Sequence, residues 1–328
     1  MSVRPTAIAL FMVLLGAAAL VAYLAFGAHH ISAASVVEAL RSPQAGQFDH
    51  IVVNDMRLPR AFAACLVGAC LGVAGTMIQG ITKNPIAEPG LLGLNQGAAL
   101  ATVVAMGSFG LAEPQLLTLV AGAGVLVVAV VVFTIALAIP GGLSPLTLIL
   151  VGAAVNGLLV ACLSFASLIY EQSFEYLRVW LSGSLAGYSA INNSLVSPWV
   201  LAALVLACWL APHIDRVQLG DEVAKGLGAN LPLIYGLSLG CIIVLIAASV
   251  TLAGPIFFVG LVVPHLLRML GFHRYSLLIP LSALAGAVLL LALDLVARVA
   301  LAPVEISVGI VAALVGGPLF IGLVKWRL

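Results

Sequence analysis

Residues 57–82, RLPRAFAACLVGACLGVAGTMIQGIT, contain the pattern that decides the fold, a long apolar stretch with a stripe of small residues. Short side chains recur at every fourth position, at Ala64, Gly68, Gly72, Thr76 and Gly80. On a helix this spacing places them on one face, and small residues let helix backbones approach closely inside a membrane. Residues 59–81 are therefore predicted to form a tightly packed transmembrane helix, and Gly236 and Gly240 repeat the spacing later in the chain.

The composition of the whole chain also indicates a membrane protein. Hydrophobic residues make up 63% of the 328 positions and charged residues 8%, about a third of the ~25% found in soluble domains. A net charge of +1 argues against nucleic acid as a partner, because phosphate binding needs clustered Lys and Arg. The five cysteines are scattered without a CxxC pair, which is typical of buried free thiols.

Ten apolar stretches are separated by segments that are polar or rich in Pro and Gly. A helix needs ~20 apolar residues to cross the ~30 Å hydrocarbon core. The first stretch is longer than the apolar region of a signal peptide, so it is predicted to remain as a helix. We expect an all-α, single transmembrane domain over residues 1–328, with ten spans and both termini cytoplasmic. The stretches are 7–28, 59–81, 91–108, 115–139, 145–169, 195–212, 233–253, 256–271, 277–297 and 306–324.

This orientation places eight Lys and Arg residues on the cytoplasmic side and five outside, in agreement with the positive-inside rule. The outer five are Arg41, Arg57, Arg60, Arg178 and Arg298. Arg57 and Arg60 lie together at an outer helix end. Because the positive-inside rule disfavours positive charge there, their position indicates a functional role. Asp294 precedes Arg298 by four residues, a spacing that predicts an ion pair within one helix.

No hydrolytic motif is present in the sequence. A P-loop needs Gly-Lys followed by Ser or Thr, whereas the three lysines precede Asn84, Gly226 and Trp326. HExxH is also missing, so the chain is not expected to be an enzyme, and any ATP hydrolysis would belong to a separate subunit. Ion-coupled carriers usually hold ionisable residues at mid-membrane. The spans are nearly free of them, and Glu88, beside Pro89, is expected in a cytoplasmic re-entrant segment rather than at mid-depth. This pattern favours a passive conduit moved by partners over a secondary transporter.

Residues 213–232 form the longest polar segment on the predicted cytoplasmic side. Within it, Leu219–Gly228 is predicted to contain a short helix, with Asp221 and Glu222 in the first turn and Lys225 later, which complements the helix dipole. Gly228 supplies the stop. From the residues alone, a solvated loop helix and a partner-binding helix fit equally well. Arg178, in a predicted outer loop helix, is a candidate contact for an anionic substrate, and a solvated arginine is the alternative.

Several sequence blocks together resemble a known family. In chain order they are Arg57-Leu-Pro-Arg60 with Asn84-Pro-Ile-Ala-Glu-Pro-Gly-Leu-Leu-Gly93, Trp180-Leu-Ser-Gly-Ser184, Leu219-Gly-Asp-Glu222 through Gly228, Gly254-Pro-Ile-Phe-Phe-Val-Gly-Leu-Val-Val-Pro-His265 with Arg268, and, more weakly, Asp294-Leu-Val-Ala-Arg298 with Glu305 and Gly309. The chain is similar to the permeases of binding-protein-dependent ABC importers (type II importers) for iron-siderophores, haem and vitamin B12.

The resemblance implies a multi-pass permease of the bacterial inner membrane without a cofactor or a metal of its own. Its expected partners are two cytoplasmic ATP-binding subunits, a periplasmic substrate-binding protein and a second permease subunit, either the same chain or a paralogue. Ferric siderophores are the expected cargo, with haem and cobalamin as alternatives within the family.

The resemblance also implies roles for particular residues. Arginines matching Arg57, Arg60 and Arg298 receive acidic residues of the binding protein. The polar cytoplasmic helix is the coupling element, and its expected ATPase contacts are Gly220, Asp221, Glu222, Ala224, Leu227 and Gly228. The expected cytoplasmic gate consists of Asn84, Pro85, Ile86 and Ser144.

Overall fold

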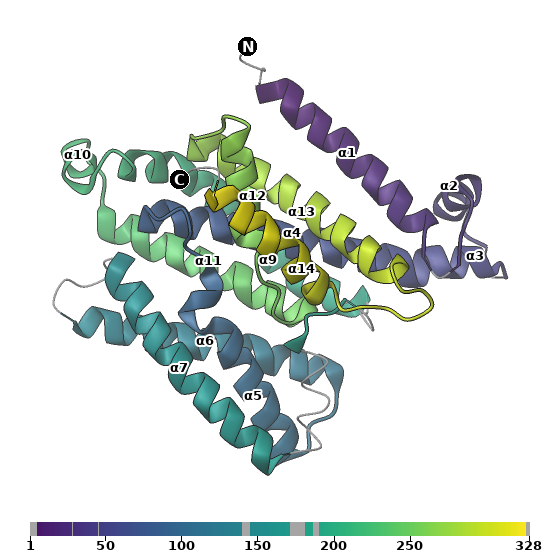
Figure 1. Ribbon diagram of the computed structural model, residues 1–328, viewed down its shortest axis with the longest axis horizontal. Coiled ribbons are helices and arrows are strands. Elements are labelled where there is room, and N and C mark those ends of the chain that lie inside the picture. Colours follow the sequence, from purple (N-terminus) through teal and green to yellow (C-terminus); the bar gives the residue numbers. More distant parts are fainter. Residues whose placement is uncertain are drawn as a thin grey trace.

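A computed structural model describes residues 5–27, 29–44, 46–139, 145–170, 181–185 and 190–325. Within these ranges every regular element is a helix and no strand is present (Figure 1). The predicted site residues Ser144 and Arg178 lie outside the described residues. The elements are α1 (Pro5–Ala25), α2 (Ala33–Arg41), α3 (Phe48–Ile51), η1 (Val52–Arg57), α4 (Leu58–Thr82), η2 (Pro89–Leu92), α5 (Leu94–Phe109), α6 (Pro114–Ala138), α7 (Pro145–Ile169), α9 (Ala190–Val217), α10 (Asp221–Gly226), α11 (Leu231–Ala253), α12 (Val259–Met269), α13 (Tyr275–Val299) and α14 (Val308–Lys325).

Each of the ten predicted apolar stretches overlaps one of these helices. Six helical segments are long and apolar enough to cross a membrane, by length and composition: Phe48–Thr82, Leu116–Ala138, Leu150–Ile169, Ser194–Val217, Leu231–Ala253 and Tyr275–Val299. Three shorter apolar helices cover Ala9–Ala25, Val259–Met269 and Val308–Leu319. The described chain is therefore all-helical with six candidate membrane spans.

Helix α4 lies at the centre of the helical body (Figure 1). In its candidate span 83% of the best apolar window is buried within the chain, against 17% for α7. Its neighbours are α13, α11, α12 and α9. Both helices are apolar on all sides, as membrane spans are, so burial rather than composition marks α4 as the core element and α7 as peripheral within this chain.

The small-residue stripe of α4 makes the close backbone contacts that its spacing predicts. A Cβ added to Gly68 would lie 2.2 Å from the carbonyl oxygen of Gly286 in α13, and one added to Gly72 would lie 2.4 Å from that of Ser282, also in α13. Gly75, which is not part of the stripe, approaches α12 as closely, because its Cβ would lie 1.9 Å from the carbonyl oxygen of Gly260. Gly236 and Gly240 of α11 differ, because an added Cβ there would meet nothing within 4 Å. The close helix contact expected at those two glycines is thus not made within the described chain.

The segment after α4 folds back into the helical body. Lys83, with a left-handed φ of 51°, ends α4, and the chain then runs through η2 into α5. Glu88 lines a small cavity with Leu71, which lies halfway along α4, and with Ser249 of α11. The predicted re-entry is present, but Glu88 lies level with the middle of α4 rather than at an end of the body, which corrects the sequence-based placement.

Candidate functional sites at the two ends of the helical body

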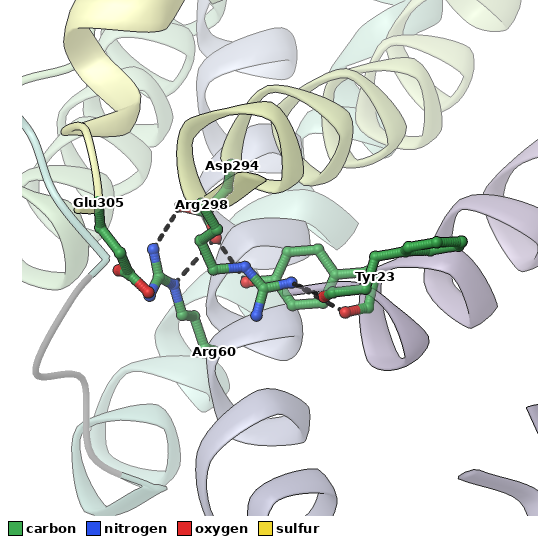
Figure 2. Close-up of polar contacts among 6 residues, drawn as sticks. Tyr23, Arg60, Asp294, Arg298 and Glu305 are labelled. Carbon is green, nitrogen blue, oxygen red and sulfur yellow. Dashed lines mark hydrogen bonds and ion pairs between the residues drawn. The ribbon is translucent and has the colours of Figure 1, made fainter. Parts of the chain in front are cut away.

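The first candidate site is a cluster of three arginines beside the C-terminal end of α1. Arg57 ends η1, Arg60 lies in the first turn of α4, and Arg298 lies in the last turn of α13. Figure 2 shows the side chains of Arg60 and Arg298 converging with those of Tyr23, Asp294 and Glu305. The cluster borders a cavity of about 300 Å³, whose lining is Gly27, His29, Val52, Asp55, Met56, Arg57, Arg60, Leu185, Arg298 and Glu305.

Arg60 is held by two carboxylates that differ in exposure. Its Nε and Nη2 donate to Asp294 Oδ2 and Oδ1, both at 2.9 Å, and its Nη1 donates to Glu305 Oε2 at 2.7 Å. The Asp294 side chain is fully buried, whereas that of Glu305 is 40% exposed. Asp294 also accepts a hydrogen bond from Tyr23 Oη at 2.5 Å. Such a bidentate Arg–carboxylate pair fixes the orientation of the guanidinium and is stronger than a single hydrogen bond.

The predicted ion pair between Asp294 and Arg298 within α13 is wrong. Asp294 binds Arg60 of α4 instead, and Arg298 Nη2 donates to the backbone carbonyls of Tyr23 and Phe26 at 2.8 and 3.2 Å. The guanidinium carbon of Arg298 also lies 3.9 Å from the centroid of the Tyr23 ring, a cation–π contact. The long-range partners prevail because they satisfy a buried carboxylate and two backbone carbonyls at once.

Arg57 and Arg298 together cap the C-terminus of α1. Arg57 Nη1 donates to the carbonyls of Leu24 and Ala25 at 2.5 and 3.0 Å, and its Nη2 donates to that of His29. The last carbonyls of a helix lack partners within it, and its C-terminus attracts cations. Arg57 and Arg298 are each only 5% exposed. Of the three arginines predicted to dock a partner, Arg60 is therefore the most accessible, although its side chain is only 13% exposed.

The second candidate site is α10, at the opposite end of the body (Figure 1). The short helix predicted in the polar segment is present over Asp221–Gly226, and Gly228 has a φ of 79° just beyond it. Asp221 Oδ1 accepts hydrogen bonds from Lys83 Nζ at 2.6 Å and from Tyr235 Oη at 3.1 Å. The hydrogen bond from Lys83 is the main cause that holds the pKa of Asp221 below its ordinary value. Helix α10 is thus tied to the end of α4 and the start of α11.

An apolar stripe on and beside α10 faces outward. Leu219, Val223 and Leu227 are 61%, 52% and 58% exposed; Val223 lies within α10, whereas Leu219 and Leu227 flank its two ends. Among the predicted ATPase contacts, Glu222, Leu227 and Gly228 are exposed, but Ala224 is fully buried and can only support the helix. Leu219 and Val223 were missed by the sequence-based assignment, although both are large apolar residues within the polar segment 213–232.

The gate residues that the structure describes, Asn84, Pro85 and Ile86, directly follow Lys83 at the end of α4. Asn84 Oδ1 accepts the backbone N–H of Ile86 at 3.1 Å, which shapes the turn, and the Ile86 side chain is 54% exposed. Lys83, immediately before them, makes the ion pair with Asp221 at 2.6 Å. The structure thus joins the gate segment to α10 through Lys83, a residue that the sequence-based prediction did not select.

The remaining histidines and cysteines form no common site in the described part of the chain. His29 Nε2 lies 3.1 Å from Asp49, while His30 packs edge-on against Phe26, so the adjacent pair points to different partners. The described residues hold no group of three or more His, Cys, Asp or Glu that could bind a metal ion. Cys70 and Cys241 are buried, but Cys208 is exposed on α9.

Known proteins share this architecture over nearly the whole chain. The FecCD transport family profile matches residues 13–326. The iron-uptake system permease protein FeuB of Bacillus subtilis (strain 168) is 35% identical over 300 residues, 92% of this chain and 90% of FeuB. The ferric enterobactin transport system permease protein FepD of Escherichia coli (strain K12) is 36% identical over 304 residues, 92% of this chain and 90% of FepD.

A solved structure supports the same assignment. A metal-chelate type ABC transporter in an inward-facing conformation superposes with a TM-score of 0.87 at 30% identity, covering 98% of this chain and 100% of that chain. The family consists of transport subunits and not of enzymes, and it accounts for the many apolar helices as those of a multi-pass bacterial inner-membrane protein. The chain belongs to the FecCD transport family.

Proposed function

We propose that this chain is the permease of a binding-protein-dependent ABC importer for ferric siderophores or related metal chelates. ATP is hydrolysed on separate subunits. The observation that carries the proposal is the match, over about nine-tenths of both chains, to relatives named as permeases of an iron-uptake system and of a ferric enterobactin transport system. Haem and cobalamin are the alternative cargoes within the family.

The proposed docking site for the periplasmic binding protein is the 300 Å³ cavity bordered by Arg60. Arg60 offers a guanidinium to an acidic side chain of the partner. Arg57 and Arg298 shape the cavity by fixing the end of α1, and they add positive charge behind Arg60. Charge pairs of this kind contribute orientation and fast encounter more than affinity.

The proposed contact with the ATP-binding subunit is α10 with its exposed stripe. Leu219, Val223 and Leu227 supply apolar contact, and Glu222, Gly220 and Gly228 border them. Movement of α10 would reach the gate segment at Asn84, Pro85 and Ile86 through the Lys83–Asp221 ion pair. The stripe and this ion pair support the proposal because they give α10 both an outward-facing surface and a connection inward.

The proposed topology has ten spans and both termini in the cytoplasm, with α10 cytoplasmic and the arginine cluster periplasmic. Two ATP-binding subunits and a second permease subunit, either the same chain or a paralogue, complete the importer. Leu150, Leu158, Phe165 and Leu168 of α7 are all more than half exposed, which suits contact with lipid or with that second subunit. The partners select between outward-open and inward-open states by binding one better than the other.

Reconstitution tests the proposed function. The chain is placed in vesicles with the candidate ATP-binding subunit, and the candidate binding protein is added outside. A panel of ferric siderophore, ferric citrate, haem and cobalamin serves as cargo. We expect uptake of an iron chelate that needs both ATP and the binding protein. Uptake that proceeds without the ATP-binding subunit and follows a proton gradient would instead establish an ion-coupled secondary transporter.

A further inference from the structure

We propose that Glu305 is a resident substitute for the carboxylate of the docking partner. It occupies one edge of the Arg60 guanidinium in the free permease, and the partner's carboxylate displaces it on docking. This inference rests on the proposed docking role of Arg60 and assigns Glu305 the task of setting docking affinity. Glu305 lies in the segment between α13 and α14, at the border of the cavity.

The geometry of Arg60 leaves one edge for exchange. All three guanidinium nitrogens are engaged, Nε and Nη2 by Asp294 and Nη1 by Glu305. A guanidinium has five N–H donors in a fixed planar fork, and these two carboxylates use three of them, leaving one N–H on each Nη. An incoming carboxylate that binds the outer Nη1–Nη2 edge in a bidentate manner therefore meets Glu305 at Nη1. A partner's carboxylate therefore competes with a carboxylate that is already bound.

Burial decides which carboxylate can leave. Asp294 is fully buried and also accepts the Tyr23 hydroxyl at 2.5 Å. Removing its partner would strand a buried charge, which is strongly unfavourable. Glu305 is 40% exposed, and water solvates it once it is released, so its bond to Arg60 is the weaker one. Displacement therefore occurs at Nη1, and Asp294 keeps Arg60 aimed at the cavity throughout.

The segment that carries Glu305 is hydrogen-bonded to the interior. Ser182 Oγ donates to Ser307 Oγ at 2.6 Å, and the backbone N–H of Gly309 donates to the Gly183 carbonyl at 2.9 Å. The neighbouring Ser184 N–H donates to the Ala253 carbonyl at the end of α11, at 2.8 Å. Release of Glu305 thus acts on a segment that is connected, through backbone and side-chain hydrogen bonds, to the α11–α12 junction.

Exchange also predicts an unusual salt dependence. When one carboxylate replaces another on Arg60, the number of ion pairs at this position stays the same, so added salt should change this part of the docking energy little. Without Glu305 the partner forms a new ion pair, and salt screening weakens it. Neutralising Glu305 should therefore make docking tighter at low salt and more sensitive to salt.

The test measures docking of the binding protein that supports uptake in the reconstituted importer, with the permease and its ATP-binding subunits in nanodiscs. For Glu305→Gln we expect a Kd roughly twofold to fivefold lower at low salt, with a steeper rise of Kd as salt increases. Asp55→Asn is the matched control, because exposed Asp55 lines the same cavity and makes no ion pair with Arg60. Glu305→Ala, which also removes the hydrogen-bond acceptor, should match or exceed the effect of Glu305→Gln.

The outcomes separate the exchange from docking itself. If Arg60→Gln weakens docking but Glu305→Gln leaves Kd unchanged or raises it, docking at Arg60 stands and the exchange is refuted. Equal tightening by Asp55→Asn and Glu305→Gln would also refute it, because general cavity charge would then explain both. If Arg60→Gln has no effect on docking, the proposed docking site and the exchange both fail. Thermal stability is measured in parallel for each variant. Because Arg60→Gln leaves the buried Asp294 carboxylate without its cation, Arg60→Lys, which keeps the charge but not the planar fork, is tested beside it, and its effect on docking counts in the same way.

Discussion

The substitution Arg57→Met tests whether Arg57 stabilises the fold by capping α1 or contacts the docking partner directly. Arg57 donates to the Leu24 carbonyl at 2.5 Å and to two further carbonyls, and it is 5% exposed. A carbonyl left without a partner costs about 1–3 kcal/mol, and a cation at a helix C-terminus contributes up to about 2 kcal/mol. The Ala25 carbonyl keeps a second donor, the backbone N–H of Ile31 at 3.0 Å. We therefore expect Arg57→Met to lower the free energy of unfolding by about 2–4 kcal/mol.

The assay is unfolding in mixed micelles of a mild detergent and sodium dodecyl sulfate, followed by circular dichroism and compared with binding-protein docking. Arg41→Met is the control, because Arg41 lies exposed in the last turn of α2 and should change the unfolding free energy by less than about 0.5 kcal/mol. Arg57→Lys keeps the charge without the planar fork and should fall between the two. A stable Arg57→Met protein that no longer docks its partner would refute the capping role and restore Arg57 as a direct docking residue.

Three further predictions concern α4 and α10. Gly68→Ala should lower the free energy of unfolding by about 1–3 kcal/mol, because its Cβ would lie 2.2 Å from the Gly286 carbonyl. Gly240→Ala, whose Cβ would meet nothing within 4 Å, should leave the free energy of unfolding unchanged or slightly higher in the same titration. Val223→Asp should abolish ATP-driven uptake and pull-down of the ATP-binding subunit while the thermal unfolding midpoint stays at the wild-type value, since Val223 is 52% exposed; retained uptake would exclude the stripe as the contact. Lys83 lowers the pKa of Asp221, so the stabilisation from their ion pair is present above the ordinary Asp pKa of about 3.9 and is lost as pH falls through the lower folded value. Hydrogen exchange in α10 should therefore show, relative to Lys83→Met, constant protection from about pH 8 to 5. The protection should be lost only below about pH 4.

The ten long helices could be predicted from the sequence because each one contains a continuous apolar stretch, but their partners could not; the short helices α2 and α3 were not predicted. The spacing of Gly68 and Gly72 shows that one face of α4 must be approached closely. It does not show whether α13, α11 or another helix approaches, because many apolar faces in this chain are equivalent by composition. The glycines of α11 illustrate the limit, since Gly236 and Gly240 carry the same spacing and meet nothing within 4 Å.

For the two candidate sites, too, features set by residues close together in the sequence could be predicted, whereas contacts between distant residues could not. The short helix α10 was predictable because its charges and stop signal lie within ten residues of one another. The presence of positive charge on the outer side could be predicted for the arginine cluster, but the hydrogen-bond and ion-pair partners of its arginines could not. Arg57 and Arg298 reach α1 from 33 and 275 residues away, and the local rule that pairs Asp294 with Arg298 fails because Arg60 offers a two-pronged partner to a buried carboxylate.

The position of α4 constrains how the two sites communicate. Arg60 lies in its first turn and Lys83 directly follows its last residue, so the proposed docking and coupling contacts stand at opposite ends of one buried helix. Gly68 and Gly75 press its backbone against α13 and α12 at distances that no side chain could share, and closely packed interfaces of this kind move as units rather than deform gradually. We therefore infer that α4, α12 and α13 move together as one body. On this inference α4 transmits a displacement between its two ends without bending.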